Sequence, residues 1–186
     1  MEDILSNFID IVQNYILTVN PFIALIISFL LIVSESIIPI LPLAVFITLN
    51  TMLFGNIIGF IISIAATITG CMLSFCLFKK IRKNKKDSNI VSKINNINFS
   101  TLTMILALPF TPAFAINIAA GITGISTKKY LMSLLISKPI IVYFWEFVGS
   151  SLIENISNPI ICVKILLVLI SIYIICWTVN KKLGIE

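Results

Sequence analysis

The stretch "ESIIPILPLAVF" at residues 35–46 decides the fold, because it has a counterpart, "ILALPFTPAFAI", at residues 105–116. Each stretch contains the pattern P-x-x-P at the same spacing, with an offset of 70 residues. The four prolines are Pro39, Pro42, Pro109 and Pro112. A proline inside a helix removes a backbone donor and clashes with the preceding turn, which costs about 3 kcal/mol. The pattern predicts helix breaks at corresponding positions of two repeats. The alternative is two ordinary kinked helices.

The composition is that of a membrane protein. Apolar residues make up 59% of the 186 positions and charged residues only 11%, whereas soluble domains carry about 25% charged residues. Residues 36–78 contain no charged residue. As one helix they would be about 65 Å long, roughly twice the ~30 Å hydrocarbon core of a bilayer. We therefore expect an all-α, polytopic integral membrane protein that forms a single membrane domain and turns within the bilayer.

The positive charges predict the topology. They cluster at residues 79–86, "KKIRKNKK", and recur at residues 128–129 and 181–182, so the positive-inside rule places all three groups in the cytoplasm. A complete crossing by residues 101–121 would put residues 128–129 outside. A hairpin that enters and leaves from the cytoplasm removes this conflict. The repeat then makes the first break a hairpin entered from outside, which gives two opposed re-entrant helical hairpins in an inverted repeat.

The predicted organisation has five parts. They are an amphipathic helix or tilted span at 1–20, a first repeat at 21–78, a basic cytoplasmic linker at 79–100, a second repeat at 101–153, and a final span with a basic tail at 160–182. Within the second repeat, Pro139 is expected to interrupt its helix. Tyr130 is expected at the cytoplasmic interface, where amphipathic rings are enriched. Because the basic linker adjoins a span, we expect it to contact anionic lipid rather than nucleic acid.

Four polar residues in the apolar segments are functional candidates, namely Glu35, Asn117, Lys138 and Glu146. A carboxylate at membrane depth is costly and by default suggests a function. Burial favours its neutral form, so Glu35 could carry a proton; the alternative is a solvated interfacial carboxylate. Lys138 and Glu146 are about 12 Å apart along one helix, so either is expected to pair with Glu35 or with a hairpin instead. The alternative for Lys138 is snorkelling to the interface, and for Asn117 an ordinary interhelical hydrogen bond.

The sequence offers little for catalysis or cofactor binding. It contains no histidine, and its four cysteines form no C-x-x-C pair, which argues against a zinc or haem site. No nucleophile–base pair or phosphate-binding loop is visible. We therefore predict that the protein is not an enzyme and that it uses no cofactor.

The residues around the breaks resemble a known family. Glu35 precedes the first pair of prolines as E-x-x-x-P-x-x-P, and Pro112 is followed by Asn117 and Gly121 as P-x-x-x-x-N-x-x-A-G. Over about residues 20–155 the chain resembles the DedA superfamily, also called SNARE-associated or VTT-domain membrane proteins. The resemblance implies two membrane-inserted hairpins that face each other. It also implies lipid translocation, either of undecaprenyl phosphate or of phospholipid headgroups, in the bacterial cell membrane.

The chain departs from the family pattern at two places. Many members have an arginine about five residues before the second proline of the later hairpin, where this chain has Ala107. Many also have an acidic residue just after the first hairpin's prolines, where Leu43 and Ala44 stand. An arginine would bind phosphate bidentately. Without it, phosphate binding would rest on backbone N–H groups at broken helix ends or on Lys138.

The predicted function is the movement of a phospholipid or an isoprenoid phosphate lipid between leaflets, as a flippase or scramblase, with coupling to protons through Glu35. We expect the loss of Glu35 to damage this activity most. The predicted partners are membrane lipids and protons, and the sequence leaves a homo-oligomer open. The alternative is a non-transport interaction or assembly protein with the same fold. A water-accessible cavity between the hairpins would favour transport, and a dry, packed centre would favour the alternative. The predicted site residues are Glu35, Pro39, Pro42, Pro109, Pro112, Asn117, Gly121, Lys138 and Glu146.

Overall fold

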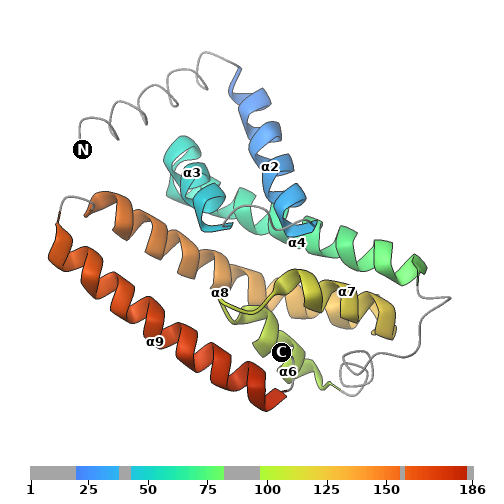
Figure 1. Cartoon of the computed structure of the whole chain (residues 1–186). Helices are drawn as coiled ribbons and strands as arrows, with labels where there is room; N and C mark the ends of the chain where they lie inside the picture. The colour runs from blue at the N-terminus through green and yellow to red at the C-terminus, as the bar shows by residue number, and fades with distance from the viewer. Residues whose placement is uncertain (1–19, 38–42, 82–96, 156–157, 184–186) are drawn as a thin grey trace.

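The computed structural model describes residues 20–37, 43–81, 97–155 and 158–183, and within these ranges it is all-helical (Figure 1). The described helices are α2 (Pro21–Ile37), α3 (Leu43–Phe54), α4 (Asn56–Ile81), α6 (Phe99–Ala107), α7 (Ala113–Thr123), α8 (Thr127–Glu154) and α9 (Pro159–Leu183). Three of them, α4, α8 and α9, are long and apolar enough to cross a membrane. The predicted all-α, multi-pass membrane class is therefore confirmed.

The two halves of the molecule repeat one order of elements. The short helix α3 begins at Leu43 and the short helix α7 begins at Ala113, so their starts share the 70-residue offset of the prolines. Each short helix is followed by a glycine with positive φ, Gly55 at 81° and Gly124 at 82°. The long helices α4 and α8, of 26 and 28 residues, come next. The repeat in sequence is therefore also a repeat in backbone geometry.

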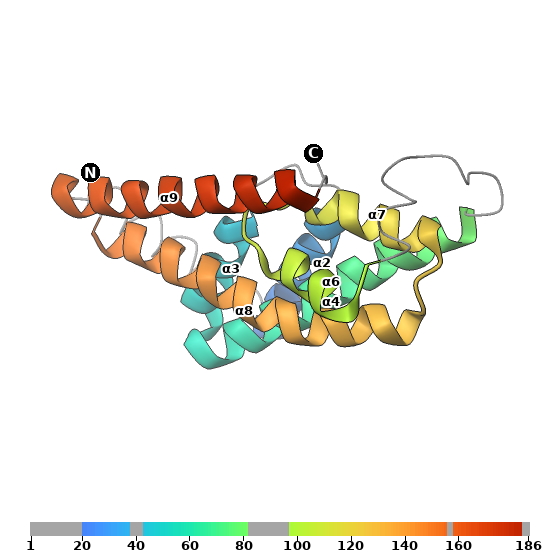
Figure 2. The same ribbon diagram turned by 90° about the horizontal axis from the view of Figure 1, so that it is seen from below.

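The two halves pack across each other. The long helices α4 and α8 contact each other and run in opposite directions (Figures 1 and 2). The short helix of each half packs on the long helix of the other, α3 on α8 and α7 on α4. Within the halves, α2 and α3 pack on α4, and α6 packs on α8. The two halves therefore contact each other through their short and long helices, and the inversion of the repeat across the membrane stays a prediction.

The second P-x-x-P separates two helices that are each too short to cross a bilayer. The helices α6 and α7 contain 9 and 11 residues, about 14 and 17 Å, against a hydrocarbon core of ~30 Å. Residues 108–112 connect them without helical structure. The predicted break at Pro109 and Pro112 is therefore present, and its membrane sidedness stays a prediction. Pro39 and Pro42 lie outside the described residues.

Two helices begin with the same local device, an asparagine followed by proline. The Oδ1 atom of Asn20 accepts a hydrogen bond from the backbone N–H of Phe22 at 3.0 Å, at the start of α2. The Oδ1 atom of Asn158 accepts one from the N–H of Ile160 at 3.2 Å, at the start of α9. Asparagine pairs with otherwise unsatisfied N–H groups, and the fixed φ of proline suits the first helical position.

One local prediction was wrong. Helix α8 continues without interruption through Pro139, because packed neighbours in a membrane protein compensate for a lost backbone hydrogen bond. Tyr130 is fully buried within the protein, and its depth in the membrane stays a prediction. Its ring stacks on Phe75 with centroids 4.4 Å apart, and its hydroxyl group has a protein partner, so the residue has no need of interfacial water.

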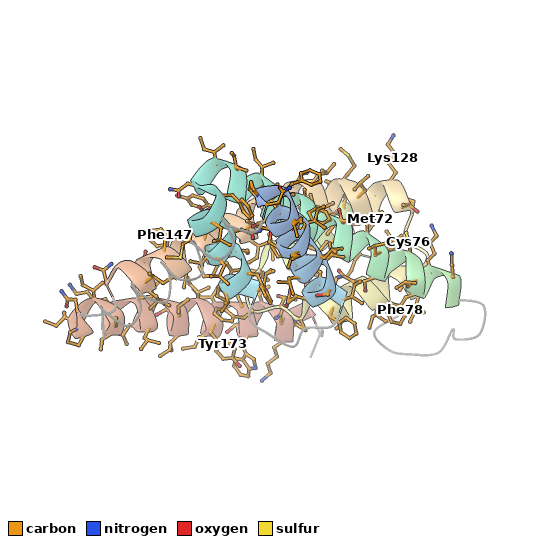
Figure 3. The ribbon with its side chains drawn as sticks, turned by 90° about the horizontal axis from the view of Figure 1, so that it is seen from above. Met72, Cys76, Phe78, Lys128, Phe147 and Tyr173 are labelled. Atoms are coloured by element: carbon orange, nitrogen blue, oxygen red, sulfur yellow. The ribbon has the colours of Figure 1, made fainter. Side chains whose placement is uncertain are left out.

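The positive charges of both halves gather at one end of the bundle, called here the basic end. Its residues are Lys79, Lys80, Lys128 and Lys129. The Nζ atom of Lys79 donates a hydrogen bond to Thr127 Oγ1 at 2.8 Å, which joins the end of α4 to the start of α8. Figure 3 shows Lys128 at the same end as Cys76 and Phe78, with Phe147 at the other. One topology can therefore place all four lysines on the cytoplasmic side.

The outer surface of the bundle is apolar. Large hydrophobic side chains of α2, α4, α8 and α9 are exposed. In the most apolar part of α9, only 6% of the residues are buried within the protein. Exposed apolar surface on this scale marks contact with a membrane or a partner. Together with the three spanning helices, it identifies a multi-pass membrane protein.

Candidate functional site

A cavity of about 350 Å³ lies where the two halves meet. Thr67 and Cys71 line it from α4, and Lys138 and Ile141 line it from α8. These four residues lie about halfway along the two long helices. The cavity is therefore near the midplane of any bilayer that α4 and α8 cross.

Two oppositely charged side chains line this cavity, Glu35 from the last turn of α2 and Lys138 from α8. Lys138 is only 3% exposed, and its charge interacts electrostatically with the Glu35 carboxyl group. Among the described residues, the Lys138 ammonium group makes no hydrogen bond or close ion pair. An ammonium group held in a largely apolar site attracts an anion, because burying a charge without a partner is costly.

The N-terminal ends of both short helices also reach the cavity. Leu43 and Ala44 line it from α3, and residues 113–115 line it from α7. The first N–H groups of a helix have no intrahelical partner, and the N-terminus carries partial positive charge. At α7 the position before the helix is Pro112, which provides no side-chain cap. Two helix N-termini and one lysine therefore surround a single space, a combination suited to binding an anion.

The structure brings together part of the predicted site. The predicted residues that line the cavity are Glu35, Pro109, Pro112 and Lys138. Pro39 and Pro42 lie outside the described residues. Glu146 is half-buried on α8 and is not part of the cavity wall. Glu35 therefore shares the cavity with Lys138 and not with Glu146, and a direct pair between Glu35 and Lys138 stays a prediction.

Asn117 and Gly121 lie on α7 beyond the cavity, toward the basic end. The Oδ1 atom of Asn117 accepts a hydrogen bond from the Tyr130 hydroxyl group at 2.5 Å, so it links α7 to α8. A Cβ atom at Gly121 would lie 2.6 Å from the carbonyl oxygen of Phe75. The glycine therefore lets α7 pack closely on α4, as small residues do between membrane helices.

Sequence reasoning missed the contact between α9 and the α6–α7 turn. Thr111, which lines the cavity, exchanges hydrogen bonds of 3.3 Å with the side chain of Asn180. The ring of Phe110 packs edge-on against Trp145 and Tyr173, with centroids 5.5 Å apart in both cases. Phe110 and Thr111 lie between the two prolines of P-x-x-P, which could have identified them as candidates. Nothing near Asn180 in the sequence indicates its partner.

Comparisons with known proteins cover most of this site. A family model described as the VTT domain matches residues 41–151, a range that contains every cavity-lining residue except Glu35 and Ser36. The chain is 30% identical over 165 residues to the uncharacterized membrane protein YhjE of Bacillus subtilis (strain 168), across 84% of this chain and 78% of that protein. It is 24% identical over 157 residues to the uncharacterized protein YqeD of the same organism, across 78% and 76% of the two chains. No solved structure gives a significant match.

Proposed function

This chain belongs to the VTT-domain family, and from that premise we propose that it moves a phosphate-bearing lipid between the leaflets of the bacterial cell membrane. The observation that carries the proposal is the meeting of Lys138 with the N-terminal ends of α3 and α7 in one cavity. All three groups favour an anion. The location, halfway along two spanning helices, is where a headgroup must pass.

In this proposal, the headgroup phosphate occupies the cavity while the acyl or isoprenoid tail stays in lipid. Lys138 supplies the full positive charge, and the N–H groups in the first turns of α3 and α7 supply hydrogen-bond donors. The cavity volume of about 350 Å³ lies at the lower end of the range for small-molecule sites. That size suits a headgroup rather than a whole lipid.

The source of the positive charge differs from the family pattern. Position 107, where many members have an arginine, is an alanine at the end of α6. Lys138 on α8 takes over that role in this proposal. The ammonium group of lysine is a point charge, whereas the guanidinium group of arginine binds phosphate through two parallel hydrogen bonds. We therefore expect Lys138 to accept several phosphate headgroups rather than to select one by geometry.

Glu35 has a defined role in the proposed cycle. Without a headgroup, its carboxylate balances the charge of Lys138. An incoming phosphate competes with that carboxylate for the same ammonium group. A proton on Glu35 removes the competing charge and frees Lys138 for the phosphate, so proton binding and anion binding favour each other.

Reconstitution into liposomes tests the proposal. Labelled phosphatidylglycerol and a labelled isoprenoid phosphate are each placed in both leaflets, and an impermeant quencher is added outside. We expect both labels to become fully quenchable with the protein present, and only the outer half to be quenched in protein-free liposomes. Equal quenching with and without the protein, for both lipids, would overturn the proposal and favour the interaction or assembly role.

A further inference from the structure

Three buried polar groups near the cavity have no hydrogen-bond partner among the described residues. They are Ser74 Oγ on α4, Asn117 Nδ2 on α7 and Ser137 Oγ on α8. All three side chains are 0% exposed. Leaving a buried donor or acceptor unpaired costs about 1–3 kcal/mol. These three groups therefore need polar partners that the described residues do not supply.

The two serines differ from other hydroxyl residues of the same helices. Thr67 Oγ1 donates to the carbonyl oxygen of Ser63 at 2.8 Å, and Ser133 Oγ donates to that of Lys129 at 3.1 Å. Bonding to the preceding turn is the usual way in which a helical hydroxyl group is satisfied. The hydroxyl groups of Ser74 and Ser137 make no such bond, so they are free to bind a group that does not belong to their own helix.

The three groups lie on the same side of the cavity. Each lies one helical turn from a cavity-lining residue on its own helix, and always on the side of the basic end. The pairs are Cys71 and Ser74 on α4, Ala113 and Asn117 on α7, and Ile141 and Ser137 on α8. The helix α4 contacts both α7 and α8, and the hydrogen bond between Tyr130 and Asn117 joins α7 to α8.

We propose that Ser74 Oγ, Asn117 Nδ2 and Ser137 Oγ bind ordered water, and that this water extends the cavity toward the basic end. The amide Nδ2 only donates, whereas a hydroxyl group donates and accepts. A ligand of Asn117 Nδ2 must therefore accept a hydrogen bond, and water can do so while it also donates to a hydroxyl oxygen. Buried waters make about three hydrogen bonds to otherwise unsatisfied groups. None of the three residues is charged, which favours a neutral ligand over an ion.

The proposal goes beyond lipid transfer and does not depend on it. A water site adjoining the cavity gives protons and polar groups a hydrated route from the basic end to Glu35 and Lys138. The groups of α4, α7 and α8 that bind it are separate from those that line the cavity. The presence of water can therefore be measured whether or not the protein moves lipid.

Hydroxyl-radical footprinting by X-ray radiolysis tests the proposal, because radicals formed from bound water oxidise neighbouring side chains that bulk solvent does not reach. The full chain is used in lipid nanodiscs. We expect oxidation of Tyr130 and Phe75 although both are fully buried. We also expect a several-fold lower rate at Tyr130 in the double variant Ser74→Ala and Ser137→Ala. The matched control is Ser133→Ala, whose hydroxyl group is satisfied by its own helix and whose loss should leave the rate unchanged.

A soluble reference peptide added to the sample provides the standard for radical dose. Oxidation of that peptide without oxidation of Tyr130 and Phe75 in the wild type would overturn the proposal. So would an unchanged rate at Tyr130 in the double variant. If the double variant is not monodisperse, the single variant Ser137→Ala is measured in its place. A structure at high resolution gives a second readout, because we expect a water within hydrogen-bond distance of Ser74 Oγ and Asn117 Nδ2.

Discussion

Gly55 and Gly124 occupy equivalent positions in the two halves of the molecule. Each follows a short helix, each has a positive φ (81° and 82°), and each precedes a long helix. A residue in this left-handed conformation ends a helix and redirects the chain, and glycine adopts it without steric cost. The two glycines therefore let each short helix cross over to the long helix of the other half, which places both N-termini at the cavity.

Replacing Gly55 tests its backbone role. A Cβ atom at this position would meet no atom within 4 Å, so the cost of Gly55→Ala comes from the backbone alone, about 1–2 kcal/mol. We expect Gly55→Asn to cost less, because asparagine tolerates this conformation better. Thermal unfolding of the purified protein in detergent measures both. An alanine variant as stable as wild type would contradict this explanation.

Gly121 provides the opposite case and serves as a control. Its replacement is limited by space, since a Cβ atom would lie 2.6 Å from the Phe75 carbonyl oxygen. We therefore expect Gly121→Asn to be less stable than Gly121→Ala, the reverse of the order at Gly55. The same order at both positions would mean that one effect dominates both sites.

The hydrogen bond between Tyr130 and Asn117 is expected to stabilise the contact between α7 and α8. Tyr130→Phe keeps the ring stacked on Phe75 but leaves Asn117 Oδ1 without its partner, so we expect a loss of about 1–3 kcal/mol. In a double-mutant cycle with Asn117→Leu, the double variant should lose less stability than the sum of the single variants. Additive losses would show that the two groups do not interact.

The positive-inside rule predicts that the basic end faces the cytoplasm and that the connection between α8 and α9 is external. Single cysteines at Thr127 and Asn158, both exposed, test this in a background without the four native cysteines. We expect an impermeant maleimide added to intact cells to label position 158 and to reach position 127 only after lysis. The reverse pattern would invert the topology.

The fold could be predicted where its signals are local. A proline breaks a helix wherever it cannot be compensated, so the paired prolines predicted the break between α6 and α7. A long apolar run predicted the final helix α9 in the same way. Pro139 shows the limit of such signals. It has the same local chemistry as Pro109, but the continuous α8 accommodates it, and only tertiary packing distinguishes the two positions.

The site was less predictable because it depends on which faces of the helices meet. Lys138 could equally have reached an interface along its flexible stem, and only the rotation of α8 places it at the cavity that Glu35 also lines. Tyr130 lies beside the basic residues 128–129 and has the amphipathic ring that is typical of an interfacial residue. Its burial follows from the position of Asn117 on another helix, which no sequence pattern encodes.

The pH dependence of lipid transfer tests the role of Glu35. We expect wild-type transfer to rise as pH falls and Glu35 becomes protonated, because the neutral acid no longer competes with phosphate for Lys138. Glu35→Gln has no titratable group at this position and should give a flat profile. Glu146→Gln is the matched control, because Glu146 does not line the cavity. A wild-type profile in Glu35→Gln would remove Glu35 from the cycle.

The most direct measurement is the rate of phosphate-lipid transfer in liposomes that contain Lys138→Met. Interactions with a charged group are worth about 1.5–3 kcal/mol, so we expect a loss of about ten-fold or more. Lys138→Arg, which keeps the charge, should retain transfer. Lys164→Met removes an exposed lysine of α9 and should match wild type. A monodisperse Lys138→Met variant that moves the lipid at the wild-type rate would contradict the account.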